Sequence, residues 1–215
     1  MAVRTRPLRF PRRQVPRVRR IRVRSSASRR TQQRPPPGWI ALTGTPGTGK
    51  SSASRLLPYD EPIEVRDLAL RLGAGKRTGR HHVEVDLTRL ISSFRRHRSA
   101  HPAGLVVGHL AHLLPVQYTI VLRCHPLELR ARLRRARRPA RAIRENLLAE
   151  ALDVVLVEAL GRGTPVYEID TTRRRPSEVA RLVGRVIVRR PAARYGEVRW
   201  LADPRVTEQL LRGRV

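Results

Sequence analysis

The feature that constrains this chain most is a glycine-rich loop of the form G-x-x-x-x-G-K-S, which runs from Gly44 to Ser51. A short apolar run over 39–43 precedes the loop, and a helical pattern begins at Lys50. In this strand–loop–helix setting the loop N–H groups surround phosphate oxygens, the lysine reaches the β- and γ-phosphates, and the serine hydroxyl ligates Mg²⁺. The sequence therefore predicts a nucleotide site; the alternative is a glycine-rich turn that binds nothing.

The lysine of this loop stands out because the chain otherwise uses arginine. Lys50 and Lys76 are the only lysines among 46 Lys and Arg residues. Either GC-rich coding or thermal adaptation accounts for such a bias. A lysine kept at position 50 fits a need for a compact ammonium between phosphate groups.

The chain carries a large excess of positive charge. Its formal net charge is +29 over 215 residues, a length that predicts one domain with a sizeable core. A field of this sign attracts polyanions such as RNA, ribosomes or nucleotides. Residues 1–37 hold thirteen arginines and no acid, and we expect a disordered, basic Arg/Pro-rich extension there. This segment is either an RNA-binding arm or a dispensable stretch, including one translated from a mis-assigned start.

Cysteine usage and hydropathy favour a cytoplasmic protein. Cys124 is the only cysteine, so no internal disulfide can form, which fits a reducing compartment. It ends the apolar run 119–124, and this favours a buried inert thiol over a nucleophile. No apolar stretch approaches the roughly 18 residues that span a membrane, and the N-terminus has no apolar core of a secretory signal.

Strands and helices alternate along the rest of the chain. Apolar runs predict strands at 39–43, 63–65, 83–86, 104–107, 119–122 and 165–170, and helical spacing predicts helices at 50–57, 67–72, 88–97, 126–135, 140–160 and 177–188. Because the strands are apolar on both faces, we predict an α/β P-loop NTPase fold with a parallel sheet of about five strands and helices on both faces. The glycine-rich segment 73–79 follows no strand, and we interpret it as a basic loop rather than a second nucleotide fingerprint.

A P-loop on one α/β domain leaves a small kinase, an ATPase or a GTPase. The chain lacks the N-K-x-D segment that reads guanine, which weighs against a GTPase. The arginine-rich stretch 130–144 lies between two predicted helices and favours a kinase, because arginines on a closing lid stabilise phosphoryl charge and exclude water. The other interpretation of this stretch is a solvated basic helix face.

From position 40 to about position 201 the chain resembles the archaeal adenylate kinase-like family, which includes the eukaryotic nuclear adenylate kinase/ATPase of small-ribosomal-subunit maturation. The loop G-T-P-G-T-G-K-S has the family's form. The other matching segments are V-D-L at 85–87, G-H-L-A-H-L-L-P at 108–115, the stretches 121–126, 129–133 and 143–153, and G-E-V-R-W-L at 196–201. Many kinases share the loop, but its combination with the segment around His109 is specific.

This resemblance implies a nucleoside monophosphate kinase that converts ATP and AMP to two ADP with Mg²⁺, has ATPase activity, and binds a platform protein of the small ribosomal subunit. It divides the chain into a kinase domain over 38–190 with a helical lid insertion at about 130–146, and a C-terminal tail over 191–215 that packs on the domain.

The resemblance also assigns roles to individual residues. ATP binding falls to Gly47, Thr48, Gly49, Lys50, Ser51 and Ser52, with Ser51 as the Mg²⁺ ligand. Asp86 falls in the monophosphate-binding region. The expected catalytic residues are Lys50, the signature histidine His109, and the lid arginines Arg134 and Arg138.

The chain departs from the family pattern at two places. Val107 stands where the family has an acid that orients the Mg²⁺ shell, so either Asp86 or Asp170 compensates or catalysis is weak. The family's Arg-Gly-aromatic lid segment is replaced by Ala-Arg-Arg at 136–138. His109 is alternatively a packed strand-end histidine, and we give less weight to the histidines at 81, 82 and 112.

The leading hypothesis is therefore a cytoplasmic adenylate kinase. The alternative is an ATP-switched assembly factor that binds ribosomal protein and ribosomal RNA with little kinase turnover. A third reading is a P-loop kinase for another small acceptor.

Overall fold

The computed structural model describes residues 38–57, 62–78 and 83–211. The predicted disordered extension over 1–37 and the loop histidines His81 and His82 lie outside these residues. None of the helices within the described ranges is long and apolar enough to cross a membrane.

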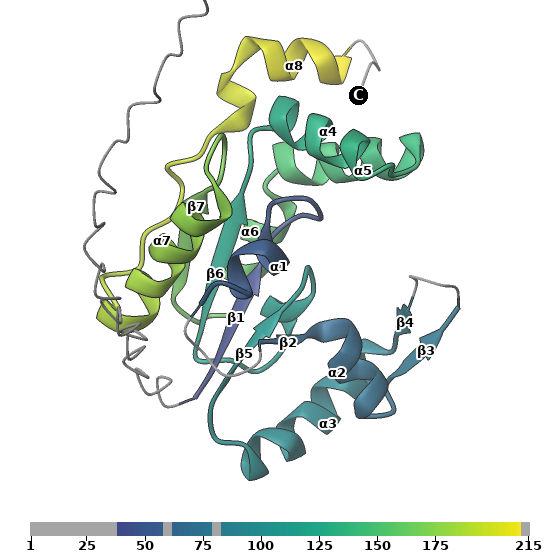
Figure 1. Ribbon diagram of the computed structural model, residues 1–215, viewed down its shortest axis with the longest axis vertical. Coiled ribbons are helices and arrows are strands. Elements are labelled where there is room, and N and C mark those ends of the chain that lie inside the picture. The colour runs from purple at the N-terminus through teal and green to yellow at the C-terminus, as the bar shows by residue number, and fades with distance from the viewer. Residues whose placement is uncertain (1–37, 58–61, 79–82, 212–215) are drawn as a thin grey trace, which may run out of the picture. The chain divides into compact units, whose positions relative to one another are not determined.

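Within the described residues, the centre of the fold is a parallel sheet of five strands in the order β2-β5-β1-β6-β7 (Figure 1). Strand β1 lies between β5 and β6, and all its residues are buried. The strands are β1 (Trp39–Thr43), β2 (Ile63–Glu64), β5 (Gly104–Val107), β6 (Tyr118–Arg123) and β7 (Val166–Asp170). The predicted P-loop NTPase fold with about five parallel strands is confirmed.

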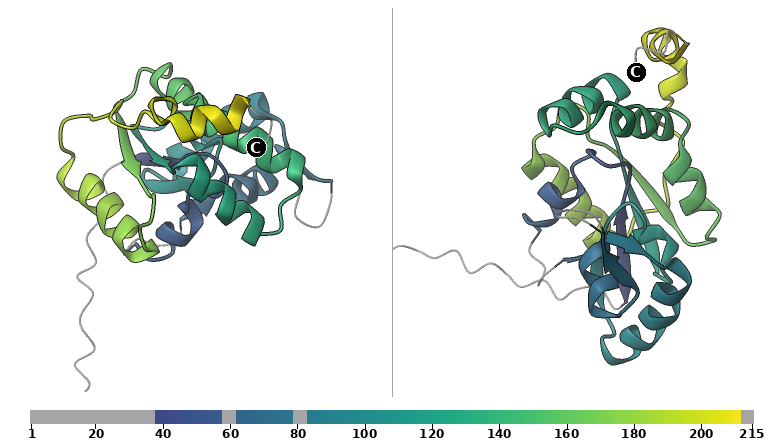
Figure 2. Two further views of the ribbon diagram at one scale, coloured as in Figure 1. Left: turned by 90° about the horizontal axis from the view of Figure 1, so that it is seen from above. Right: turned by 90° about the vertical axis from the view of Figure 1, so that its right-hand side faces the viewer.

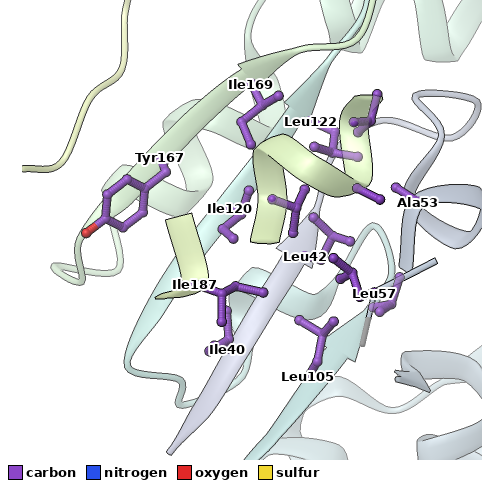
Figure 3. Packing of buried hydrophobic residues seen from close by; sticks show 14 of the residues in the cluster. Ile40, Leu42, Ala53, Leu57, Leu105, Ile120, Leu122, Tyr167, Ile169 and Ile187 are labelled. Atoms are coloured by element: carbon purple, nitrogen blue, oxygen red, sulfur yellow. The ribbon is translucent and has the colours of Figure 1, made fainter. Parts of the chain in front are cut away.

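Helices cover both faces of this sheet, because successive strand residues point to opposite sides. Ile40 and Leu42 point toward one helical layer, and Figure 3 shows them among its buried side chains. Trp39 and Ala41 point to the opposite layer. The first layer contains α1 (Lys50–Ser54) and α7 (Pro176–Arg189), and the second contains α2 (Val65–Arg71), α3 (Leu87–Ala100) and α6 (Val154–Leu160).

A helical hairpin follows β6. It consists of α4 (Pro126–Arg135) and α5 (Ala140–Ala151), and residues 126–151 are called the α4–α5 hairpin below. Its helices share a small apolar cluster of Cys124, Leu129, Leu133, Ile143 and Leu147. Burial in this cluster raises the pKa of the Cys124 thiol to about 12, as expected for an inert cysteine.

The predicted single helix over 140–160 is two helices in the structure. The chain turns at Asp153, which has a φ of 58° and separates α5 from α6. The guanidinium of Arg123 stabilises the break, because it donates to the main-chain oxygen of Glu150 at 3.0 Å and also to the Asp153 carboxylate. The prediction was wrong because the partner that favours the turn is remote in sequence.

The glycine-rich segment 73–79 is also more regular than predicted. Part of it forms β3 (Gly75–Arg77), which pairs with β4 (Val83–Val85) in an antiparallel ladder. Its residues have no strand pattern of their own; the hydrogen bonds that order them come from β4. This small sheet is separate from the parallel one.

After α7 the chain returns along β7. The N–H of Glu168 on β7 donates to the carbonyl of Arg194 at 2.8 Å. The chain then forms a short 3₁₀ turn, η2 (Trp200–Ala202), and α8 (Pro204–Leu211). Figure 2 shows α8 at the same end of the fold as the α4–α5 hairpin.

Candidate functional site

The glycine-rich loop joins β1 to α1 at the carboxyl edge of the sheet, which is where ligands bind in parallel α/β folds. Gly44 has a φ of 136°, and a Cβ there would lie 2.3 Å from the carbonyl oxygen of Leu122. Gly49 has a φ of 96° immediately before α1. Side-chain-bearing residues rarely adopt these conformations, so the glycines of the pattern are needed for the loop's shape.

A cavity of about 610 Å³ opens beside this loop. Its wall comes from the loop, from α4, and from the connection between β7 and α7. The lining residues are Gly47, Thr48, Gly49, Lys50, Ser51, Ser52, Glu128, Arg132, Arg135, Ala136, Thr171, Arg174, Arg175, Pro176 and Val179. The structure thus brings together all six residues predicted to bind ATP. The lining carries one lysine and four arginines against a single carboxylate, which suits a polyanion such as a triphosphate.

Lys50 is held at the base of the loop. Its side-chain nitrogen donates to the carbonyls of Gly44 at 2.7 Å and Thr45 at 3.0 Å. Burial lowers the pKa of Lys50 to about 8, although the negative charges of Glu64 and Glu150 act in the opposite direction. The ammonium is therefore still mostly charged at pH 7 but loses its proton at a much lower pH than an ordinary lysine, and a phosphate group beside it would favour the charged form.

The hydroxyl of Ser51 donates to Oε1 of Glu64 at 2.5 Å. Glu64 ends β2 and lies in register with Val107 on the neighbouring strand. Sequence reasoning had considered Asp86 and Asp170 as substitutes for the acid that position 107 lacks. In the structure the carboxylate beside the serine belongs to Glu64, which the sequence analysis missed.

This hydroxyl–carboxylate pair fits Mg²⁺. Both groups offer hard oxygen ligands, and the ion usually takes one or two protein oxygens while phosphates and waters complete its shell. Among the described residues, no cluster of three or more His, Cys, Asp and Glu could hold a metal by itself. One signal in the sequence could have identified Glu64: it lies in the short strand predicted at 63–65, and the carboxyl ends of parallel strands meet at the same edge of a sheet.

The α4–α5 hairpin presents different arginines to the cavity from those predicted. Arg132 and Arg135 line it, whereas Arg134 and Arg138 are exposed and are not among its lining residues. Arg132 is fixed by its donation to the main-chain oxygen of Thr171 at 2.8 Å. The catalytic role predicted for Arg134 and Arg138 stays a prediction.

Helical spacing accounts only in part for which arginines face the cavity. Leu129 and Leu133 pack onto the loop, since a Cβ on Gly47 would lie 2.8 Å and 2.9 Å from their methyl groups. Positions 130 and 132 flank these leucines on either side of the helix, so the inward leucines alone do not choose between Arg130 and Arg132. The choice of Arg132 depends on its remote contact with Thr171.

His109 and Asp86 lie away from the cavity lining. His109 follows β5 and is exposed; loss of hydration and then the nearby Lys50 charge lower the pKa of its imidazole. Asp86 is also exposed and caps α3, where its carboxylate accepts the N–H of Arg89 at 2.9 Å. The structure gives Asp86 a helix-capping role, and its part in binding a monophosphate stays a prediction.

His112 is a buried residue near the end of β1. One ring nitrogen lies 3.0 Å from the Thr43 hydroxyl, and the other lies 3.0 Å from a carboxylate oxygen of Glu158 on α6. It is the middle residue of the 3₁₀ turn η1 (Ala111–Leu113), and its two contacts link the carboxyl edge of the sheet to α6. These contacts explain the residue as a packed, hydrogen-bonded histidine.

A buried ionic cluster lies behind the loop. Arg123 is 2% exposed and pairs with Glu150 at 2.9 Å and Glu168 at 2.6 Å, and also with Asp153. The second carboxylate oxygen of Glu150 accepts the hydroxyl of Thr45 at 2.5 Å. Sequence reasoning missed the cluster, although an arginine that ends an apolar strand is expected to need buried partners.

The comparisons with known proteins match this part of the chain. The family model described as "AAA domain" matches residues 40–153. The protein named "Putative adenylate kinase" from Thermococcus onnurineus is 35% identical over 178 residues, which cover 81% of this chain and 98% of that protein. The protein of the same name from Archaeoglobus fulgidus is 41% identical over 172 residues, covering 76% of this chain and 92% of that protein.

Solved structures agree on the fold. Shikimate kinase from Acinetobacter baumannii, solved in complex with shikimate, superposes with a TM-score of 0.51. The match covers 71% of this chain and 94% of that chain at 16% sequence identity. At this identity the likeness supports the P-loop kinase-like fold and says nothing about the substrate of this chain.

Proposed function

This chain belongs to the archaeal adenylate kinase-like family, and we propose that it transfers the γ-phosphoryl group of ATP to AMP, giving two ADP. The relatives and the P-loop support a nucleotide kinase. That ATP is the donor and AMP the acceptor is our proposal. The observation that carries the proposal is the basic cavity in which the loop meets the arginines of α4 and of the β7–α7 connection.

The loop residues bind and orient the donor. Backbone N–H groups of Gly47 and Gly49 contact the phosphate oxygens, whereas the N–H of Thr48 donates to the Thr45 carbonyl at 3.2 Å. Lys50 exchanges its loop carbonyls for the β- and γ-phosphates. Ser51 and Glu64 would hold Mg²⁺, which would neutralise charge on these phosphates.

An oxygen of the AMP phosphate attacks the γ-phosphorus, and the bond from that phosphorus to the β–γ bridging oxygen breaks, so ADP is both the product and the leaving group. The chain contributes position and electrostatics, with no covalent enzyme intermediate. Arg132 and Arg135 face the transferred group and help to exclude water from it. The residues assigned to AMP in this proposal are His109, which follows β5, and Asp86, which precedes α3.

A second candidate function rests on the net charge of +29. In this alternative the protein is an ATP-switched assembly factor of the small ribosomal subunit, which binds ribosomal protein and RNA with little kinase turnover. A strongly basic chain attracts RNA through its phosphates, and such binding weakens steeply as salt is added.

One assay separates the two functions. Purified protein is incubated with ATP and Mg²⁺, with and without AMP, and ADP is followed. The kinase proposal predicts that ADP formation requires AMP, so equal rates without AMP refute it.

Lys50→Ala tests the assigned site. We expect it to lower the rate by about 10²–10³-fold, because a donor to developing phosphoryl charge is lost. The matched control is Lys76→Ala, which removes the only other lysine, an exposed one on β3. Full activity of Lys50→Ala would refute the site.

A further inference from the structure

The C-terminal tail, residues 191–211, binds the same buried cluster that holds the glycine-rich loop. The carboxylate of Glu168 accepts three successive main-chain N–H groups of the tail, those of Gly196 at 2.8 Å, Glu197 at 3.2 Å and Val198 at 3.4 Å. The Glu168 side chain is only 3% exposed, and its other oxygen is paired with Arg123. The tail is therefore fixed by a buried charge.

Trp200 is the second anchor of the tail. Its indole N–H donates to Oε1 of Glu150 at 3.0 Å. The ring packs edge-on against His125 with centroids 5.0 Å apart, and the Arg123 guanidinium lies 6.0 Å from its centroid. His125 in turn lies 3.0 Å from a carboxylate oxygen of Asp203 at the start of α8. The tryptophan is thus held by a polar contact and by two ring contacts.

Glu150 touches both the tail and the loop. One oxygen accepts Trp200, while the other accepts the hydroxyl of Thr45. The carbonyl of Thr45 is one of the two acceptors that hold the Lys50 ammonium. A continuous chain of contacts therefore runs from Trp200 through Glu150 and Thr45 to Lys50.

The ionic cluster has more carboxylates than cations, and donors from the tail compensate for this excess. Arg123 supplies one positive charge against the carboxylates of Glu150, Asp153 and Glu168. Asp153 is 35% exposed and keeps water, but the other two are nearly fully buried. Buried carboxylates need donors to replace lost hydration, and the tail provides four N–H groups.

From these contacts we infer that Trp200 and the 196–198 backbone are positioning elements of the nucleotide site, and that tail docking and ATP binding strengthen each other. When the tail leaves, Oε1 of Glu150 keeps the donors of Arg123 and Cys124 but loses that of Trp200, so the carboxylate is held less firmly as the acceptor for Thr45. When ATP binds, the loop is ordered and Glu150 is held where Trp200 docks. Such coupling is reciprocal by thermodynamic necessity. The inference rests on the proposed ATP site.

The first test compares ATP affinity by calorimetry in the presence of Mg²⁺. Trp200→Phe keeps an aromatic ring but removes the indole N–H, and we expect the Kd for ATP to rise about fivefold or more. Tyr195→Phe is the matched control, because it changes an exposed aromatic residue of the same tail, and its Kd should equal that of the wild type. Equal Kd values for Trp200→Phe and wild type would overturn the coupling.

A second test uses the unmodified full chain. Hydrogen exchange of the amides at 196–198 is measured with and without ATP and Mg²⁺. We expect slower exchange with ATP; a purely structural tail would exchange at the same rate in both, which refutes the inference. Both tests read binding rather than turnover. A protein that binds ATP with this coupling but does not phosphorylate AMP refutes the proposed kinase and leaves the inference standing.

Discussion

The two sides of the proposed active site are built differently. On the ATP side, the loop is packed against α4 and supported by the buried Arg123 cluster, and a basic cavity is already shaped. On the side proposed for AMP, Asp86 and His109 are exposed, and the Asp86 carboxylate accepts a hydrogen bond from the first turn of α3. Contacts between residues remote in sequence thus fix the side proposed for ATP (the donor half). On the side proposed for AMP (the acceptor half), the two residues lie at the ends of different elements, after β5 and before α3.

The largest effect is expected where the donor side is supported from behind. Arg123→Met removes the only cation of the cluster and leaves two buried carboxylates uncompensated, so we expect the free energy of unfolding to fall by about 3–5 kcal/mol. Urea unfolding measures this loss. Arg141→Met breaks an exposed pair on α5 and should leave the free energy of unfolding close to that of the wild type, because water screens this pair. Similar losses in the two variants would show that the donor side has no special support.

A substitution at Glu64 tests whether this residue of β2 helps Ser51 to bind Mg²⁺. Glu64→Gln keeps a partner for the Ser51 hydroxyl but removes the charge, and we expect the apparent Mg²⁺ affinity of the ATP complex to fall by about 10–100-fold. Calorimetric titration with Mg²⁺ measures this. The control is Glu84→Gln, an exposed residue on β4. An unchanged Mg²⁺ requirement would remove Glu64 from the site.

The donor side should also depend on pH through Lys50. With a pKa of about 8, this lysine is charged below that pH and loses its proton as the pH rises through it. Because bound phosphates favour the charged form, ATP binding above pH 8 requires proton uptake, and the Kd should rise by up to about tenfold per pH unit. Calorimetry between pH 7 and pH 9.5 gives both the Kd and the protons taken up. A flat profile would contradict the assigned pKa.

The smallest effect concerns the acceptor side. Asp86→Ala removes the cap of α3 and should lower the free energy of unfolding by about 1 kcal/mol, whereas Asp86→Asn keeps a capping oxygen and should not. We expect both variants to raise the KM for AMP and to leave the Kd for ATP unchanged. A wild-type KM in Asp86→Asn would leave Asp86 as a helix cap only and would sharpen the contrast between the two sides.

What the sequence predicted well was local. The loop and the strand before it follow from glycine positions and an apolar run, and the alternation of elements then implies a parallel sheet. What it missed depends on remote partners: Glu64 meets Ser51 only when β2 joins the sheet, and the break at Asp153 depends on Arg123.

The lid arginines are an intermediate case. Arginine density marks the stretch 130–144, but in so basic a chain it could not select individual residues, and the role of this stretch as a lid stays a prediction. The face of α4 that contacts the loop is set by Leu129 and Leu133, and Arg130 and Arg132 flank this face on either side. Periodicity within the helix therefore does not choose Arg132. Its contact with Thr171 required the folded chain, as did the tail contacts of Glu150.

The single cysteine makes opening of the α4–α5 hairpin measurable by thiol labelling. Cys124 is covered by the apolar side chains of the α4–α5 hairpin, and its thiol is protonated at any physiological pH. A thiol reagent can therefore label it only in the moments when the hairpin detaches from the end of β6. Because the chain has no second cysteine, the labelling signal comes from this site alone. At high reagent concentration, where labelling outpaces reclosing, its rate equals the rate of opening, and slower labelling with added nucleotide would show that the nucleotide holds the hairpin closed.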